Sequence, residues 1–104
     1  MKKFLVLLQD INHDAPFTEE QIKDYTIAHV NHLKHLDEMG ILHLCGPLKG
    51  SEQEIGMIIL NANSLDEAKN YAYDDPFVIH KCYKSCKVYE INEANAENNY
   101  LLGM

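Results

Sequence analysis

Apolar and polar stretches follow one another along the chain in an order that predicts four strands. The first is an unbroken apolar run over residues 4–8 that ends at polar residues, as a buried strand does. Short apolar runs over 41–45 and 56–61 predict the second and third strands, which a polar, glycine-containing stretch separates. A last strand is expected over roughly residues 86–91.

A long helix is marked at both ends by residues that start and stop helices. Thr18 and Gln21 have the spacing of a capping box, in which each side chain satisfies a backbone N–H at the start of the helix. The helix is expected to run to about Met39, because Gly40 can adopt the left-handed conformation that ends helices. This helix joins the first predicted strand to the second.

A second helix follows the third strand. Ser64 and Glu67 repeat the spacing of a capping box, so this helix is expected over the residues up to about Tyr73. Asp75 followed by Pro76 predicts a fresh helical turn, since Asp is a good N-cap and proline fits the first helical position.

The order strand, helix, strand, strand, helix, strand predicts an α+β fold, the ferredoxin-like βαββαβ arrangement with a four-stranded antiparallel sheet. It occupies residues 1–92, and a polar C-terminal tail follows at 93–104. Two helices cover only one face of such a sheet, yet residues 4–8 and 57–60 are apolar at every position, so both faces require burial. We therefore expect a homodimer, in which a second copy covers the other face.

Charge and composition exclude several classes of partner. The 104 residues are 46% hydrophobic and 24% charged, close to the average for globular proteins. The net charge is −7, and all nine basic residues are lysines. Without arginine the chain lacks the bidentate group that best recognises phosphate and guanine, so no nucleic-acid partner is expected. An anionic membrane surface is disfavoured for the same reason.

The chain is expected to be cytoplasmic. Its first apolar run is five residues long, whereas a signal peptide needs about 7–15, and no stretch approaches the roughly 20 apolar residues of a membrane span. The three cysteines, Cys45, Cys82 and Cys86, are too few and too irregular for a secreted disulfide framework.

The apolar side of the first helix carries a histidine. At about 100° per residue, Ile22, Thr26, Leu33 and Asp37 fall close to one line along the helix, and His29 lies near that line. A histidine that faces an apolar layer is either a core residue with both ring nitrogens satisfied or a functional group. The pattern alone leaves both interpretations open.

The run of histidines on this helix does not predict a metal site. Steps of three residues rotate His29, His32 and His35 away from one another, so the outer two cannot share one ion with the first. We expect His32 and His35 to face solvent. Cys82 and Cys86 are four residues apart, which is not the spacing of a zinc or redox pair. Neither a metal nor another cofactor is expected.

Carboxylates and an amide supply the other candidate chemistry. Asp75 has a structural role as a helix cap, and a capping carboxylate is also held rigidly enough to orient an imidazole. Gln9 and Asp10 follow the first strand, where they either end the strand or line the mouth of a pocket. Both interpretations remain open for each of these residues.

Several short motifs occur in a fixed order over most of residues 4–91. In chain order they are Gln9-Asp10, His29-Val30-Asn31-His32-Leu33 with Leu36, Gly40, Leu42 and Gly46-Pro47, Ser64-Leu65-Asp66-Glu67-Ala68, and Asp75-Pro76-Phe77 with Tyr83. Together these motifs resemble the YCII-related (YciI-like) domain family. The resemblance implies a ferredoxin-like fold that dimerises as an α+β barrel and carries a His–Asp dyad in a cleft. The positions that match the dyad are His29 and Asp75.

The resemblance also directs the choice of substrate-binding residues. The walls of the cleft are expected from the sheet and from Tyr25, Leu33 and Phe77, and Gln9, Asp10 and Gly46 complete the set. Many relatives carry an arginine three residues before the histidine, where this chain has Thr26. This departure favours a ligand other than an anionic substrate.

Two functions fit these observations. The first is a small acid/base enzyme, of the lyase or isomerase type, that acts on a small cyclic or aromatic substrate: Asp75 fixes the tautomer of His29, and the other ring nitrogen transfers a proton. The alternative is a non-catalytic dimeric module that binds a small ligand or a partner protein. An enzyme requires His29 to line a pocket, whereas a core histidine has both nitrogens satisfied by the protein.

Overall fold

A computed structural model describes residues 1–102 of the chain, and its elements follow the predicted order. They are β1 (Lys2–Ile11), α1 (Glu19–Glu38), β2 (Leu42–Pro47), β3 (Ile55–Ala62), α2 (Leu65–Tyr73), α3 (Pro76–Ile79), β4 (Tyr83–Ile91) and a 3-10 helix (Ala96–Leu101). The predicted fold class, α+β and ferredoxin-like, is confirmed. The last strand begins earlier than expected, because the polar residues at 83–85 pair with β1 at the edge of the sheet.

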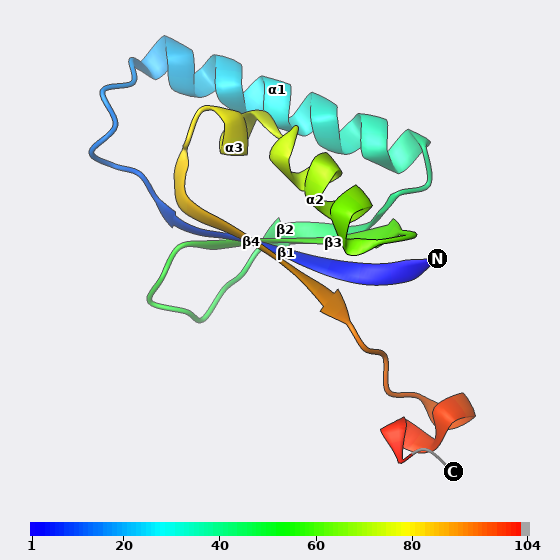
Figure 1. The fold of residues 1–104 in the computed structure, drawn as a ribbon. Coiled ribbons are helices and arrows are strands. Elements are labelled where there is room, and N and C mark those ends of the chain that lie inside the picture. Colours follow the sequence, from blue (N-terminus) through cyan, green and yellow to red (C-terminus); the bar gives the residue numbers. More distant parts are fainter. Residues whose placement is uncertain (103–104) are drawn as a thin grey trace.

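The four strands form one sheet in the order β2-β3-β1-β4, and every neighbouring pair is antiparallel. The chain crosses from β1 to β2 through α1, and from β3 to β4 through α2 and α3. Both crossings lie on the same side of the sheet (Figure 1). The end of α2 and the short α3 therefore lie beneath α1, which brings two distant parts of the sequence together.

The core lies between the sheet and this helical layer. Phe4, Val6 and Leu8 point toward the helices from β1 and are buried, together with Ile58 and Leu60 of β3. These side chains alternate along each strand, as the geometry of a pleated strand requires. Direct cross-strand pairs, such as Phe4 with Leu60 and Val6 with Ile58, place them on one face.

The opposite face of the sheet has no helix on it (Figure 1). It presents the intervening residues of the same strands, including the pairs formed by Leu5 with Ile59 and Leu7 with Met57. All four side chains are only partly buried. The homodimer predicted from the apolar pattern stays a prediction, and this open face is the surface on which it depends.

The first helix begins at the predicted residue but buries a different stripe. Thr18 and Gln21 form the complete capping box. However, Ile22 is 52% exposed, and Thr26 and Asp37 are exposed as well. The expected inward line was therefore wrong for these three residues. Apolar residues are spread around this helix, so the layer beneath α1 selects the inward face, and that face includes Leu36, which is 2% exposed.

The chain leaves the domain after β4. The 3-10 helix lies away from the sheet and the other helices (Figure 1). Its first turn is capped reciprocally by Asn95 and Asn98. Glu93, the first residue of the tail predicted at 93–104, still contacts the sheet through an ion pair of 2.9 Å with Lys3 of β1. Residues 103–104 lie outside the described part of the chain.

Candidate functional site

His29 and Asp75 form a hydrogen-bonded pair between α1 and α3. The Nδ1 atom of His29 lies 2.8 Å from each oxygen of the Asp75 carboxylate. The Asp75 side chain is 1% exposed, and the His29 side chain is 14% exposed. An ionised carboxylate only accepts hydrogen bonds, so Nδ1 carries the proton, and the Nδ1–H group donates a hydrogen bond to Asp75. In the neutral imidazole this leaves a lone pair on Nε2.

The helix start that was predicted at Asp75 is what holds this carboxylate in place. Asp75 is the N-cap of α3, Pro76 occupies the first turn, and the Phe77 backbone N–H donates to Asp75 Oδ1 over 2.9 Å. The two interpretations of Asp75 therefore apply together: the same carboxylate caps α3 and contacts His29. Its position is determined by the backbone, which limits its freedom to follow movements of the imidazole.

The imidazole of His29 is also fixed by stacking. Its ring lies against that of Phe77, with 3.9 Å between the ring centroids and 13° between the planes. Within residues 1–102 no hydrogen bond involves Nε2 of His29. In the same residues, every fully buried polar atom of a buried or partly buried side chain has a hydrogen-bond partner, so an atom without a partner is not fully buried. The Nε2 atom is therefore reachable from outside. His29 has one nitrogen satisfied by the protein and one available.

A cavity of about 260 Å³ lies next to this pair. Its lining comes from α1, from the paired ends of β2 and β3, and from Phe77 and Tyr83: Leu8, His29, Leu33, Cys45, Gly46, Pro47, Gly56, Met57, Ile58, Phe77 and Tyr83. The structure thus brings three of the predicted substrate-binding residues, Leu33, Gly46 and Phe77, together with His29.

The other three predicted substrate-binding residues lie outside this cavity. Gln9 points to the side of the sheet that carries no helix, since it pairs with Ile55 in the alternation of β1. The Asp10 N–H donates to the Glu54 carbonyl at the end of β1, with the backbone in the left-handed region. Tyr25 stacks on the ring of His80, with 3.9 Å between the centroids. Contact of these residues with a substrate stays a prediction.

Sequence reasoning missed most of the strand residues that line the cavity. Cys45 of β2 is exposed and belongs to the cavity lining. Gly56 and Tyr83 lie on different strands that both flank β1. Their proximity depends on how the strands pair, which no local pattern predicts. The available signals were Pro47 and Tyr83, which both belong to the set of ordered motifs.

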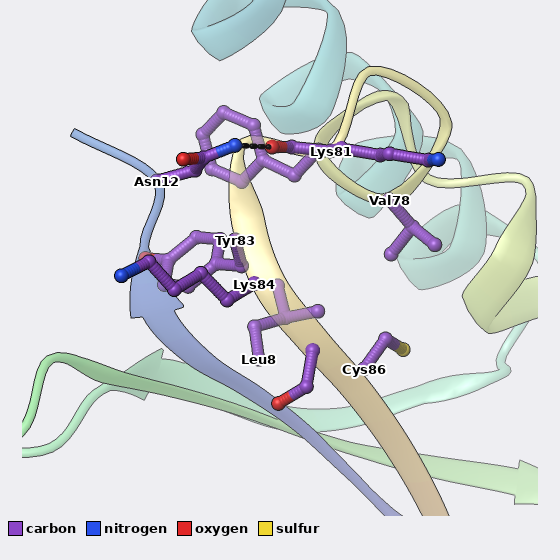
Figure 2. Close-up of a pocket in the computed structure, with 9 residues that line it drawn as sticks. Leu8, Asn12, Val78, Lys81, Tyr83, Lys84 and Cys86 are labelled. Carbon is purple, nitrogen blue, oxygen red and sulfur yellow. Dashed lines mark hydrogen bonds between the residues drawn. The ribbon is translucent and has the colours of Figure 1, made fainter. Parts of the chain in front are cut away.

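A second, larger cavity lies beside the turn before β4 and the first residues of that strand (Figure 2). Its volume is about 440 Å³, and its lining comprises Leu8, Asn12, Phe77, Val78, Lys81, Tyr83, Lys84, Ser85 and Cys86. The Asn12 side-chain amide donates to the Lys81 carbonyl over 3.3 Å and connects the end of β1 to the turn before β4 (Figure 2). Leu8, Phe77 and Tyr83 belong to the walls of both cavities.

The phenol and thiols near the site are held in their neutral forms. The pKa of Tyr83 is raised, mainly by burial and further by the negative charges of Glu54 and Asp75. Burial and the charge of Asp75 raise the pKa of Cys86 to about 11, and the same two causes raise the pKa of Cys82. Tyr83 is therefore a hydrogen-bond donor at neutral pH, and neither cysteine is activated as a nucleophile.

The second histidine of α1 is not solvated as expected. His32 is half-buried, and its Nε2 lies 3.0 Å from the Tyr71 carbonyl of α2. The cause is the inward face of α1, which includes His32. Over the described residues, no group of three His, Cys, Asp or Glu side chains is arranged to hold a metal ion. Nor is any helix within residues 1–102 long and apolar enough to cross a membrane.

Comparisons with known proteins agree with this architecture. The sequence model of the YCII-related domain matches residues 3–92. No curated protein matches the chain by sequence. Among solved structures, the chain is similar to 5-chloro-2-hydroxyhydroquinone dehydrochlorinase (TftG) from Burkholderia phenoliruptrix AC1100, in a complex with 2,5-dihydroxybenzoquinone. The TM-score is 0.65 and the sequence identity 21%, over 88% of this chain and 94% of the dehydrochlorinase.

Proposed function

Since the chain belongs to the YCII-related domain family, as its motifs predicted, we propose that it is a small acid/base enzyme of the lyase or isomerase type. Its substrate is a small cyclic or aromatic molecule, and His29 and Asp75 carry the proton transfer. One observation supports this most strongly: His29 donates from Nδ1 to a buried carboxylate, and its Nε2 has no partner among the described residues beside a cavity.

The geometry of the pair suits a base that accepts a proton at one defined atom. Because Asp75 accepts from Nδ1, the neutral imidazole carries its lone pair at Nε2, and His29 lines the cavity. The stack on Phe77 and the cap of α3 keep both partners in this arrangement. General acid–base catalysis by a positioned histidine contributes typically 10²–10⁴-fold to a rate.

The reaction then proceeds by elimination or isomerisation. An O–H or C–H proton of the ring substrate moves to Nε2, and the electron pair of the broken bond forms a new C=O or C=C bond. In an elimination the leaving group departs with the electron pair of its own bond, and His29 afterwards releases its proton to solvent. In an isomerisation His29 returns the proton at another atom of the ring. His29 ends each cycle in its initial state.

The size and lining of the cavity favour a single ring. About 260 Å³ is below the range of roughly 300–1,000 Å³ that is typical for drug-sized ligands. The walls are mostly apolar, and the flat ring of Phe77 lies beside His29. The printed name of the similar dehydrochlorinase gives a hydroxyhydroquinone as its substrate. We therefore take hydroxylated and halogenated single rings as the first substrates to examine.

The alternative function, a non-catalytic binding module, predicts a histidine whose two nitrogens are both satisfied by the protein. His29 does not match this description, because its Nε2 has no partner among the described residues. His32, by contrast, has a protein partner in the Tyr71 carbonyl and does not line the cavity. For this reason we favour the enzyme. In either case we propose that two copies associate through the open face of the sheet, where Leu5, Leu7 and Ile59 are only partly buried.

The test compares two histidine variants on the same helix. The native protein, His29→Gln and His32→Gln are incubated with a panel of chlorinated and non-chlorinated hydroxyhydroquinones, including 5-chloro-2-hydroxyhydroquinone. Ring products are followed by absorbance and free chloride by ion chromatography. We expect turnover by the native protein, a loss of about 10²–10⁴-fold in His29→Gln, and nearly native turnover in His32→Gln, because a glutamine amide can still donate to the Tyr71 carbonyl.

Retention of full turnover in His29→Gln would remove the histidine from the mechanism. Binding of the panel compounds without turnover by the native protein would favour the binding module instead. Equal losses in both histidine variants would mean that the effect comes from damage to α1 and not from chemistry at Nε2.

A further inference from the structure

We propose that the hydroxyl group of Tyr83 is the second recognition point of the site, and that it donates a hydrogen bond to a ring oxygen of the substrate while His29 contacts another. This inference rests on the proposed function, because it concerns the same cavity and names how its ligand is recognised. Tyr83 comes from β4, on the other side of β1 from the strands that line most of the cavity.

The cavity beside His29 offers few groups that can recognise a polar ligand. Most of its lining is aliphatic, aromatic or glycine. The strong side-chain hydrogen-bonding groups in its wall are the His29 imidazole and the Tyr83 phenol, with the weaker Cys45 thiol at the β2 edge. A ligand pocket needs a small number of placed polar groups to orient its ligand. Tyr83 is the hydroxyl that can supply the second one.

The Tyr83 hydroxyl is not engaged by the protein. Within residues 1–102 no hydrogen bond uses this oxygen. Every fully buried polar atom of a partly buried side chain there does have a partner, so the Tyr83 oxygen is not fully buried. The hydroxyl is therefore open to solvent. Gly56 leaves room in front of it, since a Cβ at that position would lie 3.7 Å from the Tyr83 oxygen.

The ring of Tyr83 is held in place even though its hydroxyl is free. It packs near Phe77, with 5.8 Å between the ring centroids, and Phe77 in turn stacks on His29. Tyr83 also pairs with Ile11 at the end of β1, and Figure 2 shows its ring beside this end of the strand. The phenol and the imidazole thus belong to one aromatic cluster with fixed relative positions.

The ionisation of Tyr83 makes it a donor and not a base. Burial and the charges of Glu54 and Asp75 raise its pKa, so the O–H proton is retained at neutral pH. A neutral phenol donates to a carbonyl or to a developing oxyanion on the substrate.

The same lining predicts what kind of ligand is recognised. The residues that line the cavity beside His29 include no lysine, and the chain has no arginine. Lys81 and Lys84 belong to the other cavity. A carboxylate in the first cavity would therefore have no lysine or arginine partner, which is costly in an apolar site. The geometry points to a flat ring with two uncharged oxygens, one for His29 and one for Tyr83.

Two probes of nearly equal shape test this assignment without requiring turnover. Hydroquinone has two hydroxyl groups, and in 4-methylphenol a methyl group replaces one of them. Dissociation constants for both are measured under nitrogen by ¹H–¹⁵N NMR titration of the native protein, Tyr83→Phe and Tyr89→Phe. The last variant removes a hydroxyl from the same strand at an exposed residue, so it is the matched control.

The native protein and Tyr89→Phe are expected to bind hydroquinone roughly 2- to 10-fold more tightly than 4-methylphenol, the range expected for one net hydrogen bond. Tyr83→Phe is expected to bind both probes alike. A preference for hydroquinone that survives in Tyr83→Phe overturns the assignment. So does the absence of a preference, or of any binding, in the native protein.

A measurement on the unsubstituted protein covers the case in which Tyr83→Phe does not fold. In the native protein, intermolecular NOEs are expected between the ring protons of bound hydroquinone and those of Tyr83. Binding of hydroquinone without these NOEs also overturns the inference. Failure of the proposed enzyme function has a different signature, because turnover is then absent or independent of His29 while the Tyr83-dependent preference persists.

Discussion

Replacement of Asp75 by Asn and by Ala separates its two roles. In the folded protein this carboxylate accepts from the Phe77 backbone N–H over 2.9 Å and from His29 Nδ1 over 2.8 Å. Alanine removes both acceptors. Asparagine keeps one oxygen for the backbone but presents an amide N–H₂ where the second oxygen was. The two variants therefore have different consequences for stability and for the imidazole.

The alanine variant is expected to lose about 1.5–5 kcal/mol of stability. Loss of an N-cap acceptor costs about 0.5–2 kcal/mol. The Asp75 side chain is 1% exposed, so the groups that it contacted stay largely shielded from water. A buried donor left without a partner costs about a further 1–3 kcal/mol.

The asparagine variant is expected to lose about 1 kcal/mol, because the cap to Phe77 persists and one charge-assisted hydrogen bond becomes a neutral one. Its chemical effect is larger. Nδ1 of His29 lies 2.8 Å from both oxygens, so asparagine presents it with one acceptor and one N–H₂ donor. The Nδ1–H tautomer is then no longer strongly favoured, and a share of the protons moves to Nε2. The base is reduced by this share, and complete loss of the correct tautomer in a histidine–carboxylate pair can reduce a rate by about 10⁴-fold.

Urea unfolding measures the stabilities, and long-range ¹H–¹⁵N NMR of the imidazole at a pH where it is neutral identifies the protonated nitrogen. The native protein is expected to show Nδ1–H for His29, and Asp75→Asn to show an increased share of Nε2–H with most of its stability retained. Equal losses of stability in both variants would refute the assignment of the cap. An unchanged share of Nδ1–H in Asp75→Asn would refute the control of the tautomer by Asp75.

Two further predictions concern Cys86 and the open face of the sheet. The pKa of Cys86 is raised from 9.0 to about 11 on folding, so between these pH values the folded state retains a thiol proton that the unfolded state loses. The contribution of the Cys86 thiol to stability is therefore present below pH 9 and declines as the pH rises toward 11. Urea midpoints measured across this range should fall less in Cys86→Ala than in the native protein, and parallel curves would contradict the shift. Leu7→Lys places a charge on the open face and is expected to convert the proposed dimer to a monomer, as measured by light scattering. Leu65→Lys, at an exposed residue of α2, is the control and is expected to leave the dimer intact. A native protein that is already monomeric would exclude the proposed association.

The sequence by itself determined the elements and their ends, because these depend on contacts between near neighbours. The capping box of Thr18 and Gln21 and the cap at Asp75 with Pro76 each involve residues within three positions of one another. The order of strands and helices then limits the topology to few arrangements. It also placed His29 and Asp75 on helices that cross the same face of the sheet, although their contact was expected from the family resemblance and not from spacing.

Only the tertiary structure decided which face of α1 is buried and which residues surround His29. Apolar residues occur on several sides of α1, so the inward face was set by the layer beneath it, with Ile22 left exposed and His32 turned to the Tyr71 carbonyl. Likewise, Gly56 and Tyr83 line one cavity because β3 and β4 pair with opposite edges of β1. Such proximity depends on strand register and on packing between distant segments, and these have no signature in the local order of residues.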